Sequence, residues 1–166
     1  MITTKSAMCS LLSESGIPFL RYDHPPVTTC EDAAMHLQGV EGAGSKNLFL
    51  RNKKGDRHFL VAVHEDKRVD LNRLSDIFGV GRLGFASADR LERYLGVKPG
   101  AVTILALVND TAGVVSTFFD RDLWESALIQ CHPMENTASL VMSPRDIARF
   151  LESHKRTVTV LDVPSI

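Results

Sequence analysis

A compact polar cluster, His132–Ser139, lies between two apolar runs in the last third of the chain and has the sequence His-Pro-Met-Glu-Asn-Thr-Ala-Ser. The runs on either side, Ala127–Cys131 and Leu140–Met142, are short and free of glycine, which predicts two buried strands. A loop held between two core strands is rigid, so its His, Asn, Thr and Ser side chains can point at one ligand. The alternative is a turn that is polar only because it is exposed.

A lysine follows the glycine-rich segment Gly39–Gly44 and leads into an apolar run. Strand alternation places Lys46 on the same face as Leu48 and Leu50. A lysine at the mouth of an apolar face is costly to bury unless it meets an anion or a carbonyl group. The alternative is a side chain that extends into solvent at the strand end.

A second loop with binding potential is Gly96–Gly100, with the sequence Gly-Val-Lys-Pro-Gly. Two glycines around a proline predict a tight loop whose backbone amides a ligand can approach closely. A plain turn between a helix and the core is the alternative, and the same holds for the polar pair Asn109-Asp110.

Several strings match better-known motifs, but their context excludes them. Gly79–Gly84 has the letters of a dinucleotide fingerprint, yet it follows a predicted helix and not a strand. Cys131 and His132 are neighbours, and neighbours on a strand point to opposite faces, so the imidazole cannot activate that thiol there. No cysteine or histidine pair has zinc spacing, and we expect no metal and no cofactor. The remaining histidines are interpreted as surface or structural residues: His24, His36, His58, His64 and His154.

Helices and strands alternate along the chain and would position these groups. Helices are expected at 5–15, 30–37, 70–78, 88–95 and 144–153, and strands or extended segments at 18–24, 46–52, 57–64, 114–119, 127–131, 140–142 and 157–163. The strands at 46–52 and 57–64 form a hairpin. Since short turns join several strand pairs, the sheet cannot be purely parallel. We therefore expect an α+β fold with a mixed, mostly antiparallel sheet.

Composition limits the function classes. The chain has 166 residues, 44% of them hydrophobic and 23% charged, which predicts a single domain over 1–166. A net charge of -1 gives no global basic field for nucleic acid. Local phosphate contacts could still come from a basic group around the hairpin, although a solvated edge is the commoner explanation; the group is Arg51, Lys53, Lys54, Arg57, Lys67 and Arg68.

No apolar run approaches the ~18 residues of a membrane span, and the N-terminus lacks a signal-peptide core. The three cysteines are far apart and odd in number, which favours free thiols in a reducing compartment. We therefore expect a cytoplasmic protein that does not bind membranes.

Four segments, in this order, resemble the YbaK/ProX superfamily of aminoacyl-tRNA deacylases. They are Gly44–Leu50, Gly96–Gly100, Asn109-Asp110 and His132–Ser139. Within the superfamily the chain is most similar to the free-standing prolyl-tRNA editing proteins (ProX or ProXp-ala), which resemble the insertion domain of bacterial prolyl-tRNA synthetase. The resemblance runs from about Ser10 to Val163 and departs at Ile104, where members often carry proline.

The resemblance implies a barrel-like sheet surrounded by helices and trans-editing: hydrolysis of alanine mischarged on proline tRNA. It implies that Lys46 is the essential lysine and that His132 shapes the pocket near the terminal adenosine. Four further substrate-binding positions follow with it: Asn47, Gly100, Asn136 and Thr137. The implied partner is the acceptor end of mischarged tRNA, with prolyl-tRNA synthetase as a further candidate, and we expect a monomer. The alternatives are a Cys-tRNA deacylase of the same superfamily and a non-catalytic nucleic-acid-binding or regulatory module.

Overall fold

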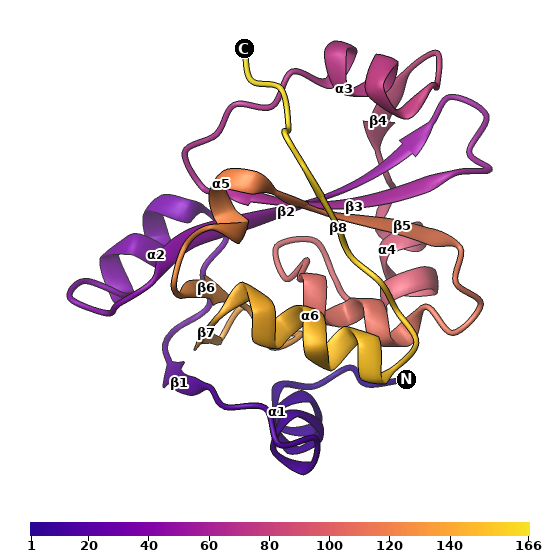
Figure 1. Ribbon diagram of the computed structural model, residues 1–166. Coiled ribbons are helices and arrows are strands. Elements are labelled where there is room, and N and C mark those ends of the chain that lie inside the picture. Colours follow the sequence, from indigo (N-terminus) through magenta and orange to yellow (C-terminus); the bar gives the residue numbers. More distant parts are fainter.

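The hairpin predicted from strand alternation forms the centre of the molecule in this computed structural model, which describes residues 1–166. It lies in an eight-stranded sheet of order β1-β7-β6-β2-β3-β5-β8, with β4 paired to β2 outside this path (Figure 1). The strands are β1 (Leu20–Asp23), β2 (Ala43–Asn52), β3 (His58–His64), β4 (Leu83–Phe85), β5 (Val115–Asp120), β6 (Ile129–Cys131), β7 (Ala138–Met142) and β8 (Thr159–Leu161).

Each long helix begins at a residue whose side chain accepts a hydrogen bond from the first turn. The helices are α1 (Lys5–Glu14), α2 (Cys30–His36), α3 (Leu71–Phe78), α4 (Ala88–Leu95), α5 (Arg121–Trp124) and α6 (Pro144–Ser153), with a 3-10 helix η1 (Ile104–Asn109). The caps are Thr4, Thr29, Asp70, Ser87 and Ser143, and such a cap contributes about 1 kcal/mol. These caps confirm the predicted helices. None of the helices is long and apolar enough to span a membrane.

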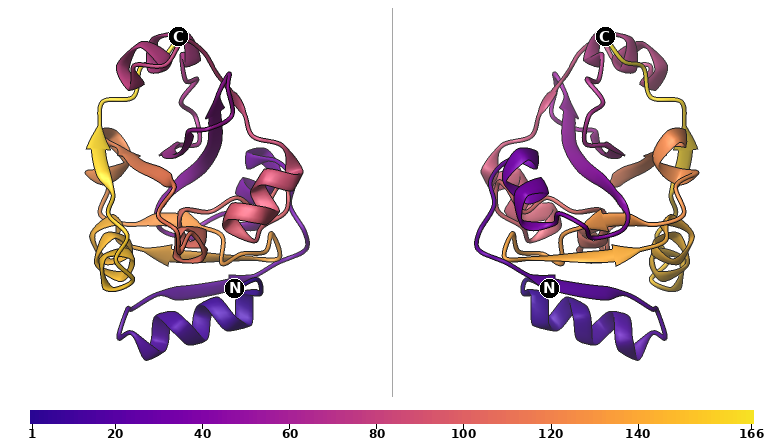
Figure 2. Two further views of the ribbon diagram at one scale, coloured as in Figure 1. Left: turned by 90° about the vertical axis from the view of Figure 1, so that its right-hand side faces the viewer. Right: turned by 90° about the vertical axis from the view of Figure 1, so that its left-hand side faces the viewer.

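The sheet is mixed, as the short turns predicted. Four strand pairs are antiparallel (β1–β7, β2–β3, β2–β4 and β6–β7), and three are parallel (β2–β6, β3–β5 and β5–β8). The sheet does not close into a barrel, because β1 and β8 stand at the two ends of the strand order and each pairs with one neighbour. The sheet is therefore open, and the barrel-like sheet that the resemblance implied is not a closed barrel. Figure 2 shows α1 and β1 as an outer layer beside β6 and β7.

Both faces of the central hairpin are buried, each by a different core. Phe49, Leu60 and Ala62 belong to a cluster of 25 buried residues, whereas Leu50 and Val61 belong to a cluster of 7 on the other face. Successive residues of a strand point to opposite faces, which accounts for this division. It also means that neighbouring residues at the start of β2 face different surroundings.

Three short elements were not predicted: η1, β4 and α5. The run Ile104–Asn109 is buried almost throughout, and a short apolar run does not show by itself whether it is helix or strand. Strand β4 has 3 residues and α5 has 4, so their conformations depend on tertiary contacts and not on local periodicity.

Candidate functional site

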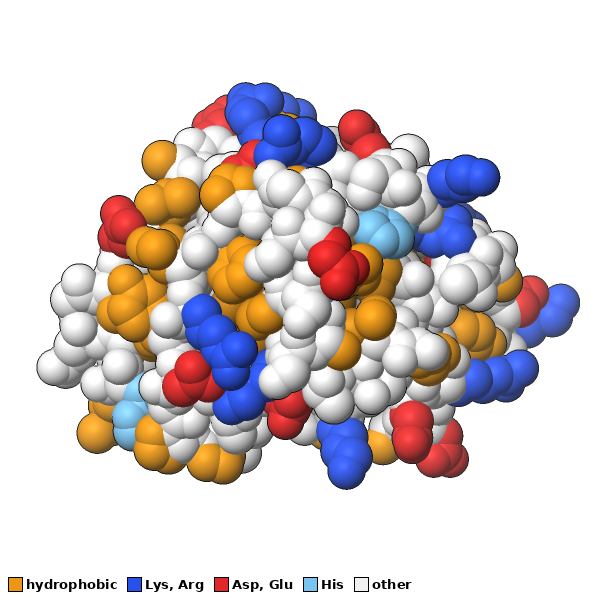
Figure 3. All heavy atoms as spheres, turned by 90° about the horizontal axis from the view of Figure 1, so that it is seen from below, with side chains coloured by type: hydrophobic (Ala, Val, Ile, Leu, Met, Phe, Trp, Pro, Cys, Tyr) orange, Lys and Arg blue, Asp and Glu red, His pale blue; other side chains and the backbone are white.

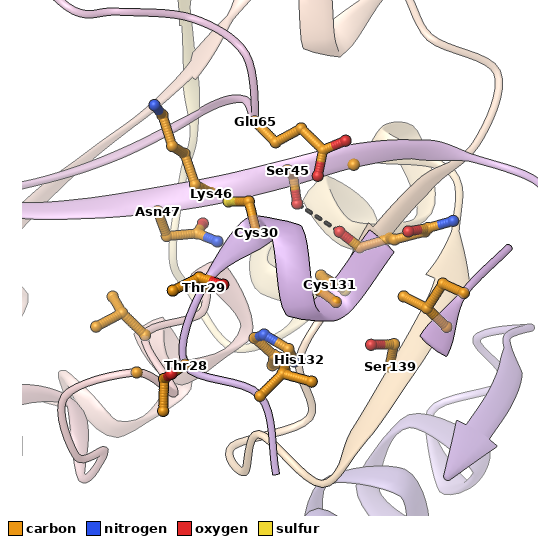
Figure 4. Close-up of a pocket in the computed structure, with 17 residues that line it drawn as sticks. Thr28, Thr29, Cys30, Ser45, Lys46, Asn47, Glu65, Cys131, His132 and Ser139 are labelled. Atoms are coloured by element: carbon orange, nitrogen blue, oxygen red, sulfur yellow. Dashed lines mark hydrogen bonds between the residues drawn. The ribbon is translucent and has the colours of Figure 1, made fainter. Parts of the chain in front are cut away.

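A cavity of about 240 Å³ opens at the start of β2, between that strand, α2, β6 and the loop that ends at Gly100 (Figure 4). It is lined by four of the six residues predicted for catalysis and substrate binding: Lys46, Asn47, Gly100 and His132. Residues more than 80 positions apart in sequence therefore share one concavity.

His132 follows the last residue of β6 and is half-buried at the cavity wall. Its Nδ1 lies 3.1 Å from the carbonyl oxygen of Ala138. Because a carbonyl can only accept, Nδ1 carries the hydrogen, and Nε2 of the neutral ring is left with a lone pair. Burial lowers the pKa of His132 below its ordinary 6.5, His24 lowers it further, and the bond to Ala138 opposes both. The imidazole is therefore neutral near pH 7, with a fixed orientation.

His24 supports this wall from behind. Its Nδ1 lies 2.9 Å from the carbonyl oxygen of Pro25, and its Nε2 is hydrogen-bonded to the Ser139 hydroxyl, also at 2.9 Å. The His24 ring stacks on His36 at 6.0 Å and meets His132 edge-on at 6.5 Å between ring centroids. The interpretation of His24 as a structural histidine thus agrees with its contacts, although its position behind the cavity had no signal in the sequence.

The side chains of Lys46 and Asn47 point to opposite faces of β2. In the antiparallel pairing with β3, Lys46 is paired with Val63 and Asn47 with Ala62. Figure 4 shows Asn47 on the side of His132 and Lys46 on the other side, at the rim. The Lys46 ammonium makes no hydrogen bond or ion pair. The Asn47 Oδ1 is buried and has no hydrogen-bond partner. An unpaired buried acceptor costs about 1–3 kcal/mol, so the amide of Asn47 is set up for a partner from outside the chain.

Glu65 was missed by sequence reasoning and is the single carboxylate among the residues that line the cavity. It lies directly over Gly44, where a Cβ would collide with the Glu65 carboxylate. Gly44 therefore keeps space for the carboxylate, which makes no ion pair or hydrogen bond of its own. The adjacent Ser45 hydroxyl donates to the carbonyl of Gln130 and joins β2 to β6.

Gly100 lines the cavity in a left-handed conformation with φ +87°, which favours glycine. Asn136 and Thr137 do not line it. The Asn136 Nδ2 donates to the Val27 carbonyl at 2.7 Å, and the Val27 amide donates back to the Asn136 carbonyl at 3.2 Å. The Thr137 carbonyl accepts from the His24 amide at 3.0 Å. These two residues fasten the segment before α2, and the Asn136 Nδ2 also lies beside Gly100, 3.8 Å from the place of a Cβ on that glycine.

The predicted phosphate-binding residues are divided by the structure. Lys53, Lys54 and Arg57 are exposed at the turn between β2 and β3, at the far end of β2 from the cavity, where Arg51 is half-buried. Lys67, by contrast, has its Nζ 2.7 Å from the buried Asp120 carboxylate and 2.8 Å from the Val163 carbonyl.

Two further sequence features have structural roles. The Asn109 amide accepts from the Ile2 N–H at 2.8 Å and donates to the Leu95 carbonyl at 2.8 Å. The Asp110 carboxylate accepts from the Val115 N–H at 2.8 Å. Burial raises the pKa of the Cys131 thiol to about 12, so this cysteine is not a nucleophile at neutral pH.

Comparisons with known proteins identify relatives along nearly the whole chain. The sequence model of the family described as "Aminoacyl-tRNA editing domain" matches residues 24–150. "Prolyl-tRNA editing protein ProX" of Acetoanaerobium sticklandii is 34% identical over 161 residues, covering 96% of this chain and 97% of that protein. "Prolyl-tRNA synthetase associated domain-containing protein 1" of Danio rerio is 40% identical over 141 residues, covering 84% of this chain and 76% of that protein. A crystal structure described as a candidate trans-editing enzyme for prolyl tRNA synthetase has a TM-score of 0.70 at 19% identity and covers 100% of both chains.

Proposed function

Because the chain belongs to the aminoacyl-tRNA editing domain family, we propose that it is a trans-editing deacylase that hydrolyses alanine mischarged on proline tRNA. One observation carries the proposal. The cavity brings together an unpartnered Asn47 amide, an unpaired Lys46 and a neutral His132 whose orientation is fixed by the backbone. The relatives named as prolyl-tRNA editing proteins support the same substrate class.

Editing is needed because alanine is smaller than proline, so the site of a synthetase that charges tRNA with proline cannot exclude alanine by size. One missing methylene costs the wrong substrate only about 1–3 kcal/mol, so a second, smaller pocket must remove what the first site admits. In this proposal the cavity of about 240 Å³ is that second pocket.

The reaction cleaves the ester between the amino acid and the terminal ribose. A water adds to the carbonyl carbon, the carbonyl oxygen becomes an oxyanion, and the ribose oxygen then leaves as a hydroxyl with a proton that derives from the water. Lys46, by rotation of its flexible stem from the rim, would stabilise the developing negative charge or the terminal phosphate. Loop amides near Gly100 would donate to the oxyanion. His132 would position the adenosine and not act as a general base.

Glu65 gives the proposal a group for the α-ammonium of the aminoacyl moiety, which every aminoacyl ester carries. A carboxylate without a partner beside an open cavity is suited to a cation. It lies on the Lys46 side of β2 (Figure 4), whereas Asn47 and His132 lie on the other side. The substrate would therefore span the edge of the strand, with its ammonium and its adenosine on different sides.

The proposal extends to the whole chain, 1–166, acting as one editing domain and as a monomer in the cytoplasm on the acceptor end of tRNA, with prolyl-tRNA synthetase as a candidate partner. Phosphate contacts would come from Arg51, Lys53, Lys54, Arg57 and Arg68; Lys67 is held by Asp120 and has no free charge to offer. The face in Figure 3 interleaves acidic and basic side chains. Because the net charge of the chain is -1 and the basic residues are local, we expect modest, salt-sensitive affinity.

The test is deacylation of a panel of aminoacylated tRNAs by the purified chain: alanine on proline tRNA, cysteine on tRNA, and correctly charged proline tRNA. We expect rapid loss of alanine and survival of proline. Faster loss of cysteine would assign the chain to Cys-tRNA deacylation instead. No deacylation of any member would contradict an enzymatic role and leave a binding module.

A further inference from the structure

A second cavity, of about 310 Å³, lies between β5, β8 and the segment that follows α6. Its wall at β5 is Val115–Phe118, which pairs with His58–Val61 at the beginning of β3. The first cavity lies beside Glu65, beyond the other end of β3. The two cavities are therefore lined from opposite halves of β3, the strand at the centre of Figure 1, and the second takes no part in the proposed deacylation chemistry.

Buried polar atoms without a partner are concentrated in these two cavities. The chain has four such atoms: Asn47 Oδ1, Thr117 Oγ1, Asp120 Oδ2 and Arg156 Nε. Asp120 Oδ2 is nevertheless 2.7 Å from the Lys67 ammonium and is paired by charge. Of the remaining three, Asn47 lines the first cavity, and Thr117 and Arg156 line the second.

Thr117 is 96% buried, at 4% exposure, so its hydroxyl has no access to bulk solvent and no partner in the chain. A folded protein normally satisfies buried hydroxyls, and an exception calls for a ligand, water or ion. Because Thr117 lines the cavity, an occupant of that cavity is the group that can supply the missing hydrogen bond.

The charges at this cavity have one sign. Lys155 and Arg156 line it, no aspartate or glutamate does, and neither cation forms an ion pair. One guanidinium nitrogen of Arg156, Nη1, donates to the Lys155 carbonyl at 3.1 Å, which leaves Nη2 and the buried Nε without partners in the chain. Gly113 gives the guanidinium space, because a Cβ there would be 3.2 Å from Nη1. Ser116, Thr157 and Thr159 also border the cavity but are exposed. Because Thr159 pairs with Phe118, strand alternation places Ser116 and Thr159 on the opposite face of the sheet from Thr117.

We propose that this second cavity binds a phosphate group. A guanidinium offers two parallel N–H donors that match two oxygens of a phosphate, and a lysine adds a positive charge that is not directed at one oxygen. The Thr117 hydroxyl donates to one of the phosphate oxygens. The phosphate belongs either to the backbone of a bound RNA or to a free phosphate compound, since both present the same oxyanion.

The experiment is a titration of the full chain with inorganic phosphate, followed residue by residue through backbone amide NMR shifts at constant ionic strength. We expect saturable shifts centred on Thr117, Arg156 and Thr157. Arg156→Gln and Thr117→Val should each weaken binding about tenfold, the loss of one hydrogen bond to a charged group. Arg73→Gln, which changes an exposed arginine on α3, is the matched control and should bind as the parent does.

Thr117→Val keeps the shape of the side chain and removes the orphan hydroxyl, so it should fold at least as well as the parent. Its phosphate affinity is then interpretable even if Arg156→Gln is unstable. The proposal is overturned if phosphate produces no saturable shifts at the cavity, or if the shifts are spread over exposed lysines and are the same in Thr117→Val and the parent.

A second arm separates the two sources. With aminoacylated tRNA as substrate, Arg156→Gln raises KM with kcat unchanged if the phosphate is part of the RNA, and the salt dependence of KM falls by about one charge. Unchanged deacylation kinetics together with lost phosphate binding assigns the cavity to a free phosphate compound. This second arm requires deacylation activity, whereas the phosphate titration stands even if no tRNA is deacylated, so failure of the proposed function and failure of this inference are distinguishable.

Discussion

The two cavities contain unpartnered polar atoms in common but differ in the groups around them. The first combines a neutral imidazole, a carboxylate, a lysine and an amide within about 240 Å³. The second combines a lysine, an arginine and the buried Thr117 hydroxyl, without histidine or acid, within about 310 Å³. A set of mixed groups can orient and polarise a reacting ester, whereas a set of uniform positive charge can only hold an anion. The difference indicates that the first cavity is the place for chemistry and the second a place for binding.

The largest expected effect tests the chemical role of the first cavity. Lys46→Ala should lower kcat/KM for alanine-charged proline tRNA by about 10²–10³, the cost of losing one well-placed charge in a transition state. Single-turnover deacylation measures it. The same variant should keep phosphate binding at the second cavity, and Arg73→Gln should keep full activity. Full deacylation by Lys46→Ala would remove the lysine from the mechanism.

The next effect concerns Asp120, a buried group that has a partner within the chain, in contrast to the unpartnered Asn47 amide. Lys67→Ala leaves the Asp120 carboxylate, which is 1% exposed, without its cation. Loss of one partner of a buried pair should lower the free energy of unfolding by about 3 kcal/mol. Urea denaturation measures this change, with the exposed Lys54→Ala as the matched control. Equal stability of the two variants would show that the Lys67–Asp120 pair contributes little.

Asn47 should behave in the opposite way, because its buried oxygen has no partner to lose. Asn47→Ala should lower kcat/KM about tenfold, or about 1.4 kcal/mol of substrate binding, without lowering the free energy of unfolding. Kinetics and urea denaturation on one preparation give both values. A clear loss of stability would mean that the Asn47 amide supports the fold and is not reserved for the substrate.

A smaller effect depends on pH. The pKa values of His132 and His58 are both lowered from 6.5, mainly by burial. Between the lowered values and 6.5 the unfolded chain binds more protons than the folded chain, so stability rises with pH across that window and is lost as pH falls through it. Denaturation midpoints below pH 6.5 measure the trend.

Deacylation should persist below pH 6.5, because His132 stays neutral there, and should decline as the ring is finally protonated. His132→Gln should lose that acidic limb along with part of its activity. An acidic limb that is unchanged in His132→Gln belongs to another group and would take the imidazole out of the pH profile.

The smallest effect concerns the hairpin turn, which belongs to neither cavity. A double variant, Lys53→Gln with Lys54→Gln, should raise KM for tRNA about two- to threefold and reduce its dependence on salt, with kcat unchanged. Initial rates at several salt concentrations measure it. If KM does not change, the turn is a solvated edge and the acceptor end is held elsewhere.

The regular elements could be predicted because their signals are local. Thr29, Ser87 and Ser143 are residue types that favour the N-cap position and predict the helices that they cap. The alternation of side chains in β2 and β3 predicts the hairpin. The parallel pairing of β3 with β5 and the open ends of the sheet depend on contacts between distant segments, which periodicity does not record.

The site was predictable in part. Resemblance singled out Lys46, Asn47, Gly100 and His132, which share the cavity. Glu65 directly follows the last residue of β3, and no motif in the sequence marks it as a site residue. Its position depends on the absence of a side chain at Gly44, which lies beneath it. The ion pair of Lys67 with Asp120 likewise forms only in three dimensions. Contacts between residues far apart in sequence cannot be predicted from the neighbouring residues. For that reason Lys67 was predicted to bind phosphate, although its charge is paired with Asp120.

The two reciprocal hydrogen bonds between Asn136 and Val27 have an evolutionary consequence. They attach one rim of the first cavity to the loop after β6, and neither bond uses Lys46 or His132. Substitutions in the attached segment can therefore retune which amino acid is admitted while the reacting groups stay constant. Selectivity and reactivity can thus diverge separately among descendants of one ancestral gene.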